Sequence, residues 1–83
     1  MKLIYFARVR EIIGKSEEEI NLPSDINKVD DLLKYLITIG DEYSSALSDF
    51  DSIHIACDEK HVDKNFNINN IKEIAIFPPV TGG

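Results

Sequence analysis

The sequence predicts a single α+β domain in which one main helix lies across one face of a mixed β-sheet. The chain has 83 residues, of which 43% are hydrophobic, so it can form one small globular core. One strongly amphipathic segment lies in the middle of the chain, with two strand-like segments before it and two after it. This order of elements is typical of a helix packed on one face of a sheet.

The first strand is predicted over residues 2–9, where β-forming and apolar residues predominate. Alternation divides the segment into two faces, with Leu3, Tyr5, Ala7 and Val9 on one and Ile4, Phe6 and Arg8 on the other. Both faces are largely apolar, which suggests a central strand. If the core covers only one face, Ile4 and Phe6 form an apolar patch that is either covered by another part of the chain or used as an interface.

A turn is predicted over residues 10–15, with Gly14 as the residue at positive φ. Residues 16–22 are predicted to form a second strand, which Pro23 ends. The glutamate run from Glu17 to Glu19 is typical of a charged edge strand that resists aggregation. Because no His or Cys accompanies these carboxylates, they do not indicate a metal site.

The most regular segment is a helix predicted over residues 28–39. Its apolar residues recur at helical spacing and form one stripe, made of Val29, Leu32, Leu33, Leu36 and Ile37. Asn27 is a favourable N-cap, and Gly40 is expected to stop the helix. A second, shorter helix is predicted over residues 42–49, with Asp41 as its cap.

Two further strands are predicted, over residues 53–58 and from Glu73 to Phe77. Cys57 is the only cysteine, and we expect a small buried residue there rather than a reactive or persulfide-carrying thiol. His54 and His61 are expected to be ordinary surface histidines, because no third ligand stands at a spacing typical of metal sites.

The first and last strands are the most apolar, and the segment between them is long enough for the crossover that parallel pairing requires. The two strands are therefore predicted to lie side by side and parallel, in a sheet of four to five strands. This arrangement is the β-grasp fold of ubiquitin-like proteins.

The charge and hydropathy of the chain limit its partners. A net charge of −6 disfavours nucleic acid and is compatible with a partner that presents a basic surface. No apolar run approaches the ~20 residues of a membrane span. We therefore expect a cytoplasmic protein without nucleic-acid or membrane binding.

The end of the sequence has the composition of a stiff, narrow stalk. Pro78 and Pro79 have a fixed φ and no N–H, so ladder pairing is expected to stop there. Gly82 and Gly83 have no side chain and can pass through a narrow slot. The sequence predicts a β-grasp domain over residues 1–78 and an extended carrier tail over residues 79–83. The terminal carboxylate, ionised at neutral pH, is a plausible substrate for an enzyme that activates acids with ATP.

Two stretches of the chain resemble the small subunit of molybdopterin synthase, a family of ubiquitin-like sulfur carriers. They read YFARVREIIG over residues 5–14 and FPPVTGG over residues 77–83. The resemblance covers the whole chain in length and element order. The ending is its most specific part, since related carriers for thiazole synthesis or tRNA thiolation also finish Gly-Gly but usually without Phe-Pro-Pro-Val before it.

The resemblance implies a role as carrier rather than catalyst. An E1-like enzyme would adenylate the Gly83 carboxylate with ATP, and sulfur would then replace AMP to leave a thiocarboxylate. The tail, formed by Pro78, Pro79, Val80, Thr81, Gly82 and Gly83, would enter the large synthase subunit and deliver sulfur to cyclic pyranopterin monophosphate. The resemblance also implies a heterotetramer of two small and two large subunits, with all catalytic side chains in the large one. It implies no bound cofactor or metal here.

The resemblance further implies an apolar docking patch on the sheet. Phe6 and Phe77 match two of its positions, and the third aligns with His61, which would make that contact more polar. The family's Gly-Asp-Glu turn before the last strand is also replaced, by residues 70–73. This departure leaves the geometry of that turn open.

Three alternatives remain open from the sequence. The chain could carry sulfur for another pathway, such as thiazole synthesis or tRNA thiolation. It could be a protein modifier, whose Gly83 forms an isopeptide bond with a lysine. It could also be an interaction domain whose tail has no function. An enzyme is disfavoured because no nucleophile–base pair is visible.

Overall fold

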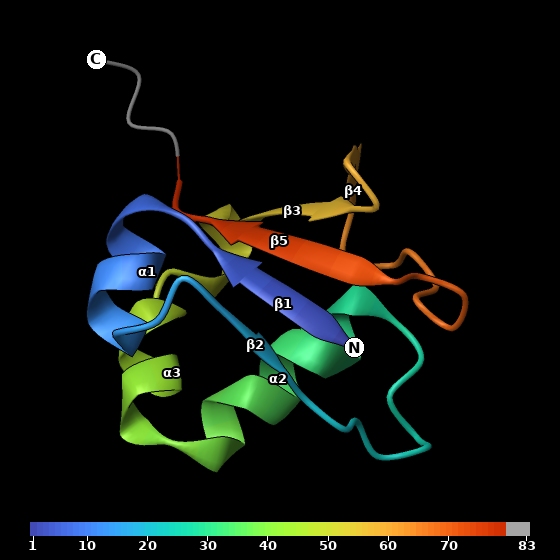
Figure 1. The fold of residues 1–83 in the computed structure, drawn as a ribbon, viewed down its shortest axis with the longest axis horizontal. Helices are drawn as coiled ribbons and strands as arrows, with labels where there is room; N and C mark the ends of the chain where they lie inside the picture. Colours follow the sequence, from blue (N-terminus) through green and yellow to red (C-terminus); the bar gives the residue numbers. More distant parts are fainter. Residues whose placement is uncertain (80–83) are drawn as a thin grey trace.

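The computed structural model describes residues 1–79 and contains a five-stranded sheet with the strand order β2-β1-β5-β3-β4 (Figure 1). The strands are β1 (Lys2–Tyr5), β2 (Glu17–Glu19), β3 (His54–Cys57), β4 (Lys60–Val62) and β5 (Glu73–Phe77). The helices are α1 (Ala7–Ile13), α2 (Val29–Ile39) and α3 (Asp41–Ala46), with a 3₁₀ turn over Phe50–Ser52. The α+β class and the mixed sheet are confirmed.

The two central strands pair as the sequence predicts. β1 and β5 are parallel, with Leu3 opposite Ile74 and Tyr5 opposite Ile76. All other pairs, β1–β2, β3–β4 and β3–β5, are antiparallel. The long connection that contains α2 and α3 allows β5 to return beside β1 in the same direction. This topology is that of a β-grasp domain.

One face of the sheet forms the core together with α2. Residues facing α2 come from the three inner strands and are almost wholly buried: Leu3, Tyr5, Ile55, Cys57, Ile74 and Ile76. The stripe on α2 supplies Val29, Leu32, Leu33 and Leu36, each fully buried. The spacing of these residues along the sequence is therefore sufficient to identify the side of the helix that packs on the sheet.

The start of α2 lies one residue later than its predicted cap. Lys28, not Asn27, occupies the N-cap position, with extended backbone. The carboxylate of Asp31 accepts hydrogen bonds from the backbone N–H of Lys28 at 3.1 Å and of Asn27 at 3.2 Å. The acidic residue in the first turn thus satisfies donors that the helix itself leaves free. Gly40 ends α2 as expected, in an extended conformation with φ −179°, and α3 begins at the next residue.

The predicted strand over residues 2–9 is wrong beyond Tyr5. The chain turns at Ala7, which has φ 51°, and continues as the helix α1. Val9 and Ile13 are buried four residues apart, and α1 packs against α3 (Figure 1). Val9 belongs to the alternation that suggested a strand, but together with Ile12 and Ile13 of the predicted turn it also follows helical spacing, at i, i+3 and i+4. The packing of this segment against α3 selects the helix over the strand.

Gly14 ends α1 in the left-handed conformation predicted for it, with φ 84°. Its backbone N–H donates to the carbonyl oxygen of Arg10 at 2.8 Å, which satisfies one free carbonyl at the end of the helix. Two further predictions are wrong: residues 10–13, predicted as part of a turn, belong to α1, and Gly40 rather than Asp41 is the N-cap of α3. The remaining differences are shifts of boundaries. The second strand, the short helix and the third strand are each shorter than the predicted residues 16–22, 42–49 and 53–58.

Asp58 fixes the turn whose geometry the sequence leaves open. Its carboxylate accepts from the backbone N–H groups of Glu73 at 3.0 Å and Lys72 at 3.1 Å. Asp58 itself lies in the turn between β3 and β4 with φ 47°. The connection before β5 is therefore held by a side chain from the neighbouring hairpin.

Candidate functional site

Three aromatic side chains form one stack at the end of β5: Phe6, which follows β1, Phe77 of β5 and His61 of β4. The rings of Phe6 and Phe77 have centroids 4.6 Å apart and are inclined by 5°. The ring of His61 follows on Phe77, with centroids 6.0 Å apart and an inclination of 24°. We call Phe6, Phe77 and His61 the aromatic surface. The three residues singled out in the sequence as a docking patch are thus brought together.

The register of the sheet explains the stack. The backbone N–H of Phe6 donates to the carbonyl oxygen of Ile76 at 3.1 Å, which continues the β1–β5 pairing by one residue. Phe6 therefore comes beside Phe77, the last residue of β5. On the other side of β5, Ala75 pairs with Ala56, which in turn pairs with His61. Small side chains at these positions leave room for His61 to reach Phe77.

The aromatic surface lies on the sheet face opposite α2. Phe6 is 41% exposed, and Ile4, Ala75 and Phe77 are half-buried. Within residues 1–79 no helix packs on this face, because the stripe of α2 contacts the other one. Among residues 1–79, Phe6 therefore belongs to an exposed patch, the second of the two possibilities that the sequence left for it. An exposed aromatic group of this kind is common at protein–protein interfaces.

The start of the predicted tail continues directly from this surface. β5 ends at Phe77, and Pro78 and Pro79 follow outside the strand and half-buried. The ladder pairing thus stops at the first proline, as the missing N–H predicts. Val80, Thr81, Gly82 and Gly83 lie outside the described residues, so the extended carrier tail stays a prediction.

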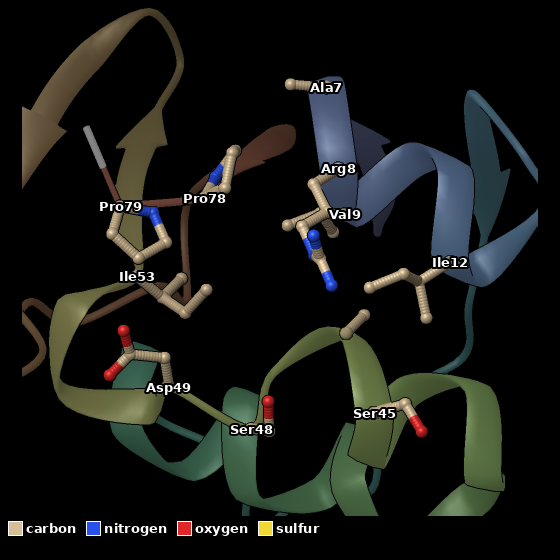
Figure 2. Close-up of a pocket in the computed structure, with 11 residues that line it drawn as sticks. Ala7, Arg8, Val9, Ile12, Ser45, Ser48, Asp49, Ile53, Pro78 and Pro79 are labelled. Atoms are coloured by element: carbon tan, nitrogen blue, oxygen red, sulfur yellow. The ribbon is translucent and has the colours of Figure 1, made fainter. Parts of the chain in front are cut away.

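A cavity of about 390 Å³ lies beside the start of the tail, between α1 and the chain around the end of α3. Figure 2 shows Arg8 and Ile12 on the α1 side, Ser45 and Ser48 below them, and Pro78 and Pro79 on the side of the tail. Asp49 and Ile53 close the remaining side. Sequence reasoning missed this cavity because it depends on α1. The spacing of Val9, Ile12 and Ile13 is the signal that could have found that helix.

A partly buried carboxylate, that of Glu18, joins β2 to the core. Glu18 Oε2 accepts hydrogen bonds from the hydroxyls of Tyr43 at 2.5 Å and Tyr5 at 2.6 Å, and Lys15 Nζ lies 3.0 Å from Glu18 Oε1. Burial by itself would raise the pKa of Glu18, but the hydrogen bonds from Tyr43, Tyr5 and Lys15 outweigh it and hold the pKa below its ordinary value. Burial and the bond to Glu18 raise the pKa of Tyr5 and Tyr43.

Cys57 is a core residue, as the sequence indicates. Its side chain is 2% exposed in β3. Burial, with a smaller contribution from the charge of Asp58, raises the pKa of its thiol to about 11. A thiol in this environment is a poor nucleophile at neutral pH. Among residues 1–79, no group of three His, Cys, Asp or Glu side chains is placed to hold a metal ion.

In the described part of the chain, every helix is too short or too polar to span a bilayer.

Residues 3–83 match the model of the ThiS family, so the match includes the end of the chain that the structure does not describe.

Curated relatives and solved structures agree with this match. The chain is 37% identical to a molybdopterin synthase sulfur carrier subunit of Dictyostelium discoideum, over 99% of this chain and 94% of the relative. It is 31% identical to the protein of the same name from Escherichia coli, over 100% and 99% of the two chains. The solution structure of small archaeal modifier protein 1 from Methanosarcina acetivorans superposes with a TM-score of 0.71 at 26% identity, covering 99% of this chain and 94% of that one. The chain therefore belongs to the ThiS family and, within it, to the molybdopterin synthase sulfur carrier subunits.

Proposed function

We propose that this chain carries sulfur on its C-terminal glycine for the synthesis of molybdopterin. The observation that supports this most strongly is the match of the whole chain to molybdopterin synthase sulfur carrier subunits, with a family match that runs to Gly83. The exposed aromatic surface next to Pro78 and Pro79 provides a place for a partner to hold the domain while it handles the tail.

The proposed chemistry uses the main-chain carboxylate of Gly83. One carboxylate oxygen attacks the α-phosphate of ATP on an adenylating enzyme, so pyrophosphate leaves and an acyl-adenylate forms. A sulfur nucleophile at the oxidation level of hydrosulfide then attacks the carbonyl carbon, and AMP leaves. The product is a thiocarboxylate that donates its sulfur to cyclic pyranopterin monophosphate. ATP is a substrate of the partner enzyme in this scheme and is not held by the carrier.

The carrier's own residues position the tail and contribute no catalytic group. Pro78 and Pro79 reduce the number of conformations of the free tail, which lowers the entropy lost when a partner binds it. Gly82 and Gly83 permit passage through a narrow channel. Catalytic side chains reside in the large synthase subunit, and we propose a heterotetramer of two small and two large subunits in the cytoplasm.

Intact and tandem mass spectrometry tests this function. The pure chain is incubated with the adenylating enzyme, ATP and a sulfur donor, with a known carrier as control for enzyme activity. We expect a mass gain equal to replacement of one oxygen by sulfur, localised to Gly83. Localisation matters because oxidation of Met1 or Cys57 gives nearly the same gain. A gain confined to Cys57 and removed by reducing agent would refute the proposal.

A second candidate function is protein modification. It is favoured by the structural similarity to small archaeal modifier protein 1. In that function the activated Gly83 carbonyl forms an isopeptide bond with a lysine of another protein. A ladder of conjugates in an extract, abolished by deletion of Gly82 and Gly83, distinguishes it from sulfur transfer alone. A carrier for thiazole synthesis or tRNA thiolation would load sulfur in the same way and is distinguished only by its acceptor.

A further inference from the structure

The cavity beside the start of the tail combines an apolar floor with a cationic side chain. Val9, Ala46 and Ile53 line it and are almost wholly buried, so they present only a small apolar surface to its interior. Ile12 is partly buried and adds aliphatic surface from α1. The guanidinium of Arg8 extends into the space from α1 in Figure 2.

The charge of Arg8 is not neutralised within the described part of the chain. The salt bridges formed among residues 1–79 use the amino group of Met1 and the side chains of Lys2, Lys15 and Lys34. Asp49 also lines the cavity, but among residues 1–79 it forms no salt bridge with Arg8. In a chain with net charge −6, Arg8 is thus an exposed cation available to a carboxylate from outside.

Two residues that line the cavity lie close in the chain to residues of the aromatic surface. Arg8 lies two residues after Phe6, and Pro78 directly follows Phe77. A partner that covers the stacked rings of Phe6 and Phe77 and takes hold of the tail would therefore pass over the cavity as well. The position fits a second contact of the same partner better than a separate small-molecule site.

We propose that the cavity receives a segment of the large subunit of molybdopterin synthase that carries a carboxylate beside an aliphatic side chain. The carboxylate pairs with Arg8, aided by the hydroxyls of Ser45 and Ser48, and the aliphatic side chain packs on Ile12 and Ile53. Together with the aromatic surface, this contact fixes the orientation of the carrier on the large subunit. The orientation in turn sets the direction in which the tail enters that subunit. The inference rests on the proposed function, because that function names the partner.

Two pairs of variants test the proposal, each with a control on the same helix. Arg8→Glu is compared with Arg10→Glu, which makes the same change of charge at an exposed position of α1 that does not line the cavity. Ser45→Trp, which fills the cavity, is compared with Ser44→Trp, an exposed neighbour on α3 outside it. Circular dichroism and thermal unfolding establish that each variant is folded.

Binding to the purified large subunit is measured by titration calorimetry. We expect Arg8→Glu and Ser45→Trp to weaken binding about tenfold or more, and each control to change it by less than about twofold. Equal losses for Arg8→Glu and Arg10→Glu would show a general charge effect and overturn the proposal. Loss of sulfur loading by the adenylating enzyme with unchanged binding to the large subunit would overturn the choice of partner.

The variant Phe6→Asp separates this inference from the proposed function. If Phe6→Asp weakens the complex while Arg8→Glu and Ser45→Trp do not, the cavity is not a contact and the carrier function stands. If the unaltered chain neither binds the large subunit nor accepts sulfur at Gly83, the proposed function fails and the inference fails with it.

Discussion

The rings of Phe6 and Phe77 lie face to face, with centroids 4.6 Å apart, although 70 residues separate them in the sequence by their numbering. The contact follows from the parallel pairing of β1 and β5, because the C-terminal ends of two parallel strands lie at the same end of the sheet. Phe77 is also the last residue before Pro78. The exposed aromatic surface and the start of the tail are therefore parts of one continuous region.

Replacing Phe6 by Asp should weaken binding to the large synthase subunit by at least about tenfold, because aromatic residues contribute strongly to interfaces. The fold should be little affected, since Phe6 is 41% exposed. Phe66→Asp is a matched control, because Phe66 is 39% exposed but lies in the connection before β5. Gel filtration of each variant with the large subunit checks the prediction. Unchanged complex formation by Phe6→Asp would show that the aromatic surface is not the docking site.

Adding one alanine after Gly83 should abolish sulfur loading and leave the domain folded. The added residue moves the terminal carboxylate and puts a Cβ where the proposed channel admits only glycine. Thermal unfolding should be unchanged, because the addition lies beyond the sheet that forms the core. Mass spectrometry after incubation with the adenylating enzyme, ATP and a sulfur donor gives the answer. Loading of the extended chain to the level of the original would disprove the role of the Gly83 carboxylate.

The Glu18 network should make stability depend on pH in the acid range. Its folded-state pKa lies below the ordinary value of 4.5, so it contributes stability above that pH which is lost as the pH falls through the lowered pKa. Glu18→Gln should lower stability at pH 7 and reduce the further loss on acidification. Urea unfolding between pH 7 and pH 3 measures both effects. An unaltered pH dependence in Glu18→Gln would mean that other carboxylates cause it.

The donors to Glu18 can be tested one at a time. Tyr43→Phe removes the hydroxyl that lies 2.5 Å from Glu18 Oε2, and it should cost about 1–2 kcal/mol at pH 7. Tyr35→Phe is the control, since Tyr35 is partly exposed on α2 and its hydroxyl makes no hydrogen bond within residues 1–79. Equal stability of the two variants in urea would argue against the network.

Cys57 should resist alkylation in the folded protein. The thiol is 2% exposed and its pKa is raised to about 11, so little thiolate is present at pH 8. Iodoacetamide should label it slowly until denaturant unfolds the chain, after which the rate should approach that of a free cysteine. Rapid labelling without denaturant would support the hypothesis that Cys57 carries a persulfide.

Local patterns in the sequence are enough to specify the class of fold and the end of the last strand. The stripe from Val29 to Leu36 and the apolar strands at both ends have a fixed period, so they identify α2, β1 and β5 without knowledge of the partners in space. Gly14 and Pro78 act through backbone geometry that belongs to the residue itself: Gly14 has the positive φ predicted for it, and strand pairing stops at Pro78 as expected.

The conformation after Tyr5 and the grouping of residues beside the tail depend on tertiary contacts. Residues 7–9 continue the alternation of β1, and packing of Val9 and Ile13 against the rest of the core selects the helix instead. The stack of Phe6, Phe77 and His61 and the cavity beside Arg8 combine residues from distant parts of the chain. Such contacts depend on strand order and register, and the periodicity of residues along one segment specifies neither of them.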